Sequence, residues 1–99
     1  MSKNRSIVYY IAENLIYDIS IKALKFNGKE IRLTPLEAHL LEFFLNNKSI
    51  LLSKKSIMEE LYGEEVEDST IRNLLARLRK KVGKDKIISI NNFGIKFIC

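Results

Sequence analysis

Residues 69–83 read STIRNLLARLRKKVG, and their apolar side chains recur at the spacing of one helix face. On a helix with about 3.6 residues per turn, five of them form one stripe: Ile71, Leu74, Leu75, Leu78 and Val82. The opposite face carries Asn73, Ala76, Arg77 and Lys80, with Arg72 and Arg79 on one flank and Lys81 on the other. One side of this predicted helix therefore needs a core, and the other side offers an amide, a small residue and several cations.

The outer face of this helix has residue types that suit duplex DNA. An α-helix fits the major groove, where Arg and Asn side chains form paired hydrogen bonds with base edges. Basic amphipathic helices also occur as ordinary solvated surface helices, so residues 69–83 alone leave both interpretations open. The rest of the chain has to decide between them.

Charge is strongly segregated along the sequence. The 99 residues carry a net charge of +5, with a pI near 9.4. Residues 59–68 contain six acids and no cation, whereas residues 72–86 contain seven cations and one acid. Charge can serve solubility alone, but its clustering on one helix and its exit favours a polyanionic partner.

Length and composition limit the class of protein. The chain is 46% hydrophobic, which fits one domain at residues 7–99 after a tail or linker at residues 1–6. No apolar run approaches the ~20 residues of a membrane span, and no apolar signal core follows the polar N-terminus, so we expect no membrane partner and a cytoplasmic setting. Cys99 is the only cysteine and His39 the only histidine, so we expect no metal site and no cofactor.

The first third of the chain predicts short strands followed by a helix. Residues 7–33 alternate β-rich runs with polar breaks, and Asn27-Gly28 is a two-residue hairpin signal, which indicates a small antiparallel sheet. Thr34, Pro35 and Glu37 are a cap, a first helical residue and a capping-box acid. A broad apolar face then predicts a central, nearly buried helix that ends at residues 46–47. His39 lies beside that face without a partner motif, and we interpret it as structural.

Two further helices and a hairpin complete the predicted order. Ser53 caps a helix that Gly63 ends, and Asp68 or Ser69 is expected to cap the helix that Gly83 ends. Residues 87–98 predict a hairpin turning at 91–92. The order of sheet, three helices and hairpin predicts an α+β winged helix-turn-helix, with the N-terminal antiparallel sheet first and the C-terminal β-hairpin as its wing.

Several motifs of the chain resemble the C-terminal winged-helix DNA-binding (effector) domain of OmpR/PhoB-type response regulators. They are LTPLE at 33–37, SKKSIMEELYG at 53–63, the 69–83 segment and GIKF at 94–97. The resemblance extends over roughly residues 7–98, nearly the whole chain, and the motifs follow the order and spacing of the family. The resemblance implies a transcriptional regulator of a two-component system that binds double-stranded DNA. It also implies a recognition helix at 69–83 in the major groove, a wing in the adjacent minor groove, head-to-tail dimers on direct repeats, and contact of the 62–69 loop with RNA polymerase.

Helix geometry and the resemblance together give the expected site residues. Bases would be read by Arg77, Asn73 and Ala76, where Arg77 matches the family's base-contacting arginine. Phosphates would be bound by Thr70, Arg72, Arg79, Lys80, Lys81, Lys54 and Lys55. Lys54 and Lys55 lie in the first turn of their helix, where cations oppose the helix dipole, so two solvated lysines without a phosphate are an equal alternative. The wing would use Asn91, Asn92 and Lys96, and the polymerase-contact loop Glu64, Glu65 and Glu67.

The sequence departs from the family at informative positions. Leu74 stands where the family often has a phosphate-contacting His, and we expect Leu74 to join the core. Asn91 stands where the wing usually has Arg, which leaves Lys96 as the nearest cation. Tyr62 replaces the usual Trp. The chain has no room for a receiver domain, so it fits either an excised effector domain or a stand-alone regulator.

Other functions remain as alternatives. The acidic residues 59–68 could dock a basic partner such as RNA polymerase, which would make the chain a protein-interaction module. An enzyme is not expected, because the sequence has no Gly-rich phosphate loop, no catalytic Cys/His/Asp set and no metal-ligand spacing. An RNA-binding sheet is disfavoured because no aromatic motif of that type is present.

Overall fold

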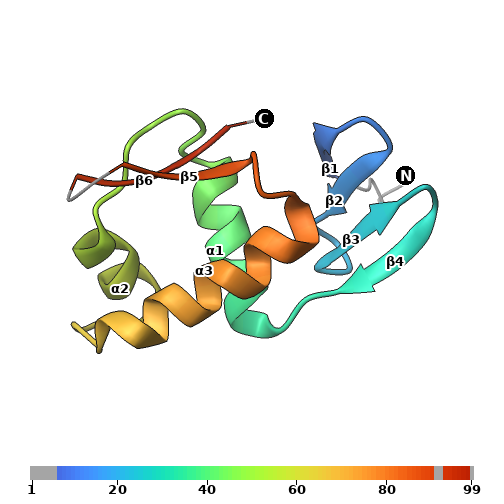
Figure 1. The fold of residues 1–99 in the computed structure, drawn as a ribbon. Coiled ribbons are helices and arrows are strands. Elements are labelled where there is room, and N and C mark those ends of the chain that lie inside the picture. Colours follow the sequence, from blue (N-terminus) through green and yellow to red (C-terminus); the bar gives the residue numbers. More distant parts are fainter. Residues whose placement is uncertain (1–6, 91–92, 99) are drawn as a thin grey trace.

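The N-terminal part of the chain is a four-stranded antiparallel sheet (Figure 1). The computed structural model describes residues 7–90 and 93–98. The strands are β1 (Val8–Ala12), β2 (Leu15–Asp18), β3 (Ala23–Phe26) and β4 (Lys29–Arg32), and they lie in chain order. Asn27 and Gly28 join β3 to β4 with φ of 52° and 82°, the left-handed conformation that a two-residue hairpin turn requires. The predicted sheet and its hairpin signal are confirmed.

Three helices follow the sheet: α1 (Pro35–Leu45), α2 (Lys54–Tyr62) and α3 (Asp68–Val82). α1 begins with the predicted capping box, in which the amide of Glu37 donates to Thr34 Oγ1 at 3.2 Å and the amide of Thr34 donates to Glu37 Oε1 at 3.0 Å. α2 begins at the predicted cap Ser53 and ends at Gly63, whose φ is 75°. None of the helices in the described ranges is long and apolar enough to cross a membrane.

The start of α3 differs from the prediction. Neither Asp68 nor Ser69 caps the helix: the N-cap is Glu67, which makes no side-chain capping bond, and Asp68 is the first helical residue. The carboxylate of Asp68 instead lies 2.8 Å from Lys54 Nζ and 2.8 Å from Arg72 Nε. These two ion pairs draw the carboxylate to the flank of the helix, which is why sequence rules for caps misplaced this end.

The core lies around α1, which contacts α2, α3 and the C-terminal hairpin. Leu40, Leu41 and Phe44 of α1 are fully buried. All five residues of the predicted apolar stripe of α3 are buried: Ile71, Leu74, Leu75, Leu78 and Val82. Leu74 therefore joins the core as expected. This packing fixes the rotation of α3 about its own axis and so decides which side chains face outward.

A two-stranded antiparallel hairpin, β5 (Ile87–Ile90) and β6 (Gly94–Phe97), closes the fold. Phe97 stacks on Phe44 of α1 with ring centroids 5.5 Å apart. The expected turn residues Asn91 and Asn92 lie outside the described residues. The α+β winged helix-turn-helix architecture predicted from the sequence is confirmed.

Candidate nucleic-acid interface

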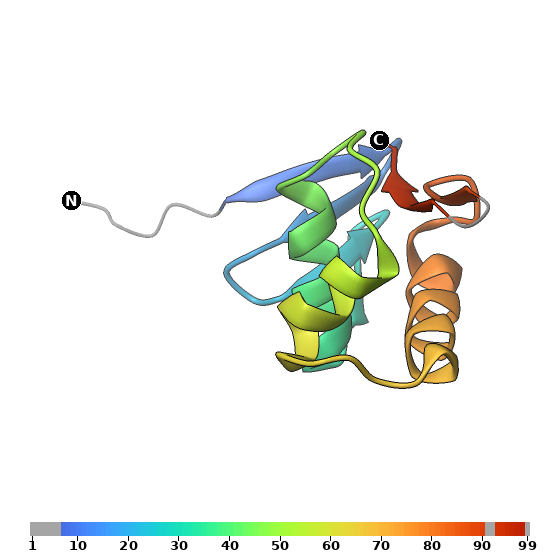
Figure 2. The ribbon, with the colours of Figure 1, turned by 90° about the vertical axis from the view of Figure 1, so that its left-hand side faces the viewer.

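The outward face of α3 carries most of the expected DNA-binding residues. Because the apolar stripe of α3 points into the core, most of the remaining side chains project to solvent. The exposed residues of this face are Thr70, Arg72, Asn73, Ala76, Arg77 and Lys80. In Figure 2, α3 stands at the edge of the molecule. A helix placed in this way can enter the major groove, which is about 12 Å wide.

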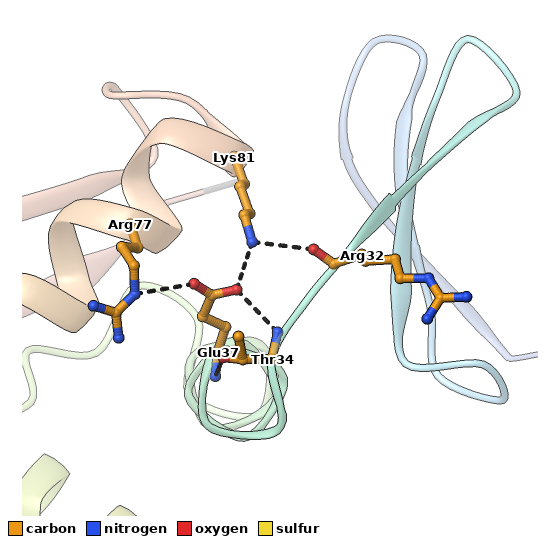
Figure 3. A network of polar contacts seen from close by, with 5 residues as sticks. All are labelled: Arg32, Thr34, Glu37, Arg77 and Lys81. Atoms are coloured by element: carbon orange, nitrogen blue, oxygen red, sulfur yellow. Dashed lines mark hydrogen bonds and ion pairs between the residues drawn. The ribbon is translucent and has the colours of Figure 1, made fainter.

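Arg77 is held from behind by a buried acid of α1. Its Nε lies 3.3 Å from Glu37 Oε2, and the side chain of Glu37 is only 1% exposed, whereas that of Arg77 is 56% exposed. Figure 3 shows that the terminal guanidinium nitrogens point away from Glu37. One edge of the guanidinium is therefore anchored, and its two terminal nitrogens remain available to a ligand.

Lys81 contacts the same acid from one helical turn further along α3. Its Nζ lies 2.6 Å from Glu37 Oε1 and 3.0 Å from the carbonyl oxygen of Arg32 (Figure 3). These contacts turn the ammonium group of Lys81 into the protein, although the sequence predicts a phosphate contact for it. Because a buried carboxylate without a cation is costly, we assign Lys81 to the support of Glu37 rather than to phosphate.

Glu37 remains charged despite its burial. Burial by itself would raise the pKa of Glu37, but the hydrogen bonds and charges of Lys81, the Thr34 amide and Arg77 outweigh it and hold the pKa below its usual range. At neutral pH the carboxylate therefore attracts both cations of α3. The acid that closes the capping box of α1 thus also orients two side chains of α3.

A groove of about 590 Å³ runs between α3 and the wing and brings three cations together. Lys54, Arg72 and Arg79 all line it, next to the α2 cap residue Ser53. Three of the expected phosphate ligands, from two helices, therefore share one surface. The other exposed candidates, Lys55, Thr70 and Lys80, do not line this groove.

Each cation of the groove already has an internal partner. Lys54 and Arg72 share Asp68 at 2.8 Å each. Arg79 donates from Nε to the carbonyl oxygen of Ile87 at 3.2 Å and from Nη2 to Ser89 Oγ at 3.5 Å. The carboxylate of Asp68 thus occupies the position from which an external anion could contact both Lys54 and Arg72. The hydrogen bonds of Arg79 connect α3 to β5. The pKa of Asp68 is lowered, mainly by its hydrogen bond from Lys54.

The acidic connection that precedes α3 carries exposed side chains. Glu64, Glu65 and Glu67 are all exposed between α2 and α3.

His39 pairs with Glu60 at 2.9 Å and so connects α1 to α2, in keeping with a structural role. Within residues 7–90 and 93–98, no group of three His, Cys, Asp or Glu side chains could hold a metal ion.

Sequence reasoning missed two residues of this site, Glu37 and Asp68, as partners of the cations. Glu37 was assigned to the capping box alone. A signal was nevertheless present, because Arg77 and Lys81 are four residues apart and so are neighbours on the helix surface, where two like charges repel each other unless an acid offsets them. Asp68 was assigned to a cap, although its spacing of four residues from Arg72 also fits the observed ion pair.

Comparison with known proteins gives a family for this architecture. The family model described as "Transcriptional regulatory protein, C terminal" matches residues 28–97. The chain is 33% identical over 87 residues to the transcriptional regulatory protein CrdR of Helicobacter pylori, covering 88% of this chain and 40% of that protein. It is 39% identical over 67 residues to the transcriptional regulatory protein PhoP of Escherichia coli, covering 66% of this chain and 30% of that protein. The chain thus spans well under half the length of these relatives.

Solved structures share the fold. The DNA-binding domain of E. coli CadC superposes with a TM-score of 0.81 at 21% identity, covering 97% of this chain and 94% of that one. The Klebsiella pneumoniae RstA DNA-binding domain, solved in complex with the RstA box, gives a TM-score of 0.79 at 18% identity, covering 96% and 98%. At these identities the likeness concerns the fold alone. With its family model matched over residues 28–97, the chain belongs to the family of transcriptional regulatory protein C-terminal domains, of the OmpR/PhoB type.

Proposed function

We propose that this domain binds double-stranded DNA sequence-specifically as the effector domain of a transcriptional regulator, with α3 in the major groove. The single observation that carries the proposal is the outward face of α3, on which the exposed fork of Arg77 is braced by buried Glu37. A braced guanidinium loses less side-chain freedom on binding than a free one, which favours directional contacts to bases. Family membership supports the same function, and we propose a cytoplasmic location with it.

Base reading is proposed for the centre of this face. Arg77 can donate two hydrogen bonds to guanine O6 and N7, and Asn73 can pair with adenine in the same way. Ala76 stands one position before Arg77 and is exposed, so its methyl group can meet a thymine methyl. These three residues would set the sequence preference.

Phosphate binding is proposed for the groove beside the wing and for the flanks of α3. Lys54, Arg72 and Arg79 share the groove, and a DNA strand lying there would bring a phosphate to the position that Asp68 now serves. The remaining proposed phosphate contacts are Thr70, Lys80, Lys55 and, in the wing, Lys96. Such contacts fix the position and orientation of the domain on the duplex without reading its sequence.

The exposed acids of the α2–α3 connection support a second, compatible role. Glu64, Glu65 and Glu67 are exposed in the loop that leads into α3, where a partner could contact them while α3 lies in the major groove. We propose RNA polymerase as that partner, and head-to-tail dimers on direct repeats as the DNA-bound assembly. Enzymatic activity is not part of the proposal.

Selection of binding sites from a random duplex pool at physiological salt tests DNA recognition. The proposal predicts enrichment of a compact motif, and a dimer predicts two copies about one helical turn apart. Bulk binding that is salt-sensitive but enriches no motif would contradict specific recognition.

A transcription assay on the selected site tests the polymerase contact. The triple variant Glu64→Gln, Glu65→Gln and Glu67→Gln is expected to keep wild-type DNA affinity and to lose regulation by purified RNA polymerase. Unchanged regulation by this variant would exclude the acidic loop as the contact.

A further inference from the structure

An aromatic side chain stands exposed in the wing. Phe93, between β5 and β6, has 69% of its surface exposed, although the burial of a Phe side chain away from water is favourable. Its amide donates to the carbonyl oxygen of Ile90 at 2.9 Å, so the backbone at this residue is held by a turn bond.

The base of the wing is fixed against the start of α2. Leu52 and Ile95 exchange two backbone hydrogen bonds of 2.8 and 2.7 Å. Gly94, next to Phe93, has a φ of 145° and lies so close to this pairing that a Cβ would come within 2.2 Å of the carbonyl oxygen of Leu52. The wing is therefore fixed on the segment that leads into α2, and Phe93 lies directly before the fixed residues Gly94 and Ile95.

Phe93 lies on the same groove as the three cations. It lines the space between α3 and the wing together with Lys54, Arg72 and Arg79. A DNA strand whose phosphates meet these cations presents, between successive phosphates, the apolar faces of its deoxyribose rings. An exposed aromatic ring on this groove is complementary to those faces, and Phe is among the apolar side chains with which minor-groove proteins contact DNA.

The wing has little capacity for an ionic contact. Residues 87–98 contain one cation, Lys96. Lys96 is only partly exposed and lies opposite Ile88 on the strand pair. An ionic wing contact would therefore depend on one side chain that is partly covered.

We propose that Phe93 is the main DNA contact of the wing, packing its ring against deoxyribose of the strand whose phosphates occupy the cationic groove. This inference rests on the proposed DNA-binding function and adds the chemistry of one contact to it. The wing then contributes mainly apolar contact area, whereas α3 and the α2 N-terminus contribute most of the charge.

The contact has a thermodynamic signature that separates it from a phosphate contact. Neutralising a phosphate releases counterions and steepens the dependence of affinity on salt, by about 0.9 in the log–log slope for each contact. Apolar packing releases none. Loss of the Phe93 ring should therefore weaken binding by a similar factor at every salt concentration.

Duplex affinity of the intact domain, measured on a selected site across a salt series, tests the proposal. Phe93→Ala is expected to weaken binding by about tenfold with an unchanged slope, whereas Arg72→Ala lowers the slope by about one. Phe93→Leu should keep most of the affinity. Tyr10→Ala is the matched control, since Tyr10 of β1 is 75% exposed and lies on the N-terminal sheet. It should bind as the wild type does.

A charge placed at the same position gives an independent test. Phe93→Lys should steepen the salt slope by about one, because the new ammonium group would lie beside the DNA strand. An unchanged slope in this variant, or wild-type affinity of Phe93→Ala, would overturn the inference while leaving the proposed function intact. Absence of duplex binding by the wild-type domain would overturn both. Unchanged melting temperatures of the Phe93 variants establish that the fold is preserved.

Discussion

Glu37 and Arg77 are 40 positions apart in the chain and meet at 3.3 Å, so that the acid which closes the capping box of α1 also braces the exposed guanidinium of Arg77 on the α3 face. Lys81 meets the other carboxylate oxygen at 2.6 Å. This arrangement divides the basic residues of α3 into two groups. Arg77 presents a free end to solvent, whereas Lys81 is committed to the protein.

Lys80 and Lys81 form a matched pair that tests this division. We expect Lys81→Ala to lower the free energy of unfolding by about 1–3 kcal/mol, because it removes a charged hydrogen bond from a buried carboxylate. Lys80→Ala should leave stability unchanged and reduce the salt slope of DNA binding by about one. Urea unfolding and a salt series measure the two quantities. The division would be wrong if Lys81→Ala reduced the slope without loss of stability.

Acid titration of stability tests the charge on Glu37. Its pKa is below the unfolded-state value of about 4.3, so its contribution is fully present above that value and is lost as pH falls through the lower folded pKa. Glu37→Gln should therefore cost stability at pH 7, and the difference from wild type should shrink below about pH 4. Glu64→Gln, at an exposed loop position, is the control. A difference that did not change with pH would argue against a charged Glu37.

Asp68→Asn tests the internal anion of the groove. The carboxylate neutralises Lys54 and Arg72, and it repels a phosphate brought to the same place. The variant is expected to bind both preferred and scrambled duplexes more tightly, with a steeper salt dependence. Glu65→Gln removes a nearby charge that is exposed in the loop and controls for net charge. Equal effects of the two substitutions would show that only net charge matters.

Gly94→Ala tests the seating of the wing. The added Cβ would lie 2.2 Å from the Leu52 carbonyl oxygen, so the backbone pairing of Leu52 with Ile95 has to shift. We expect a loss of about 2–4 kcal/mol in unfolding free energy and weaker duplex binding. Gly28→Ala is the control, because Gly28 also has positive φ but a Cβ there would meet nothing within 4 Å. A similar cost for both variants would mean that φ alone explains the effect.

Local patterns predicted the fold well. The apolar stripe of α3, the capping box of α1 and the Asn27-Gly28 turn each depend on residues close in sequence, where spacing and propensity decide the outcome. The predicted cap of α3 was wrong because Asp68 forms ion pairs with Lys54 and Arg72. Sequence rules for helix caps do not include the competition of such ion pairs for the carboxylate. Local signals therefore sufficed until a side chain had a tertiary partner to choose.

The site was less predictable for the same reason. The sequence alone placed Arg77, Asn73 and Ala76 on one outward face, and the structure has all three exposed. It could not place Glu37 against α3, since that contact exists only once α1 and α3 pack together. Nor could the sequence place Phe93 beside the cations, because the groove that they line forms only when the wing packs next to α3.

The most direct measurement is the affinity of the wild-type domain and of Arg77→Ala for the selected duplex and for a scrambled duplex of equal length and salt. The account predicts that Arg77→Ala loses about 1–3 kcal/mol on the selected duplex and little on the scrambled one, so that discrimination collapses. Equal losses on both duplexes would mean that Arg77 binds phosphate, and the claim that the outward face of α3 reads bases through its braced arginine would be contradicted.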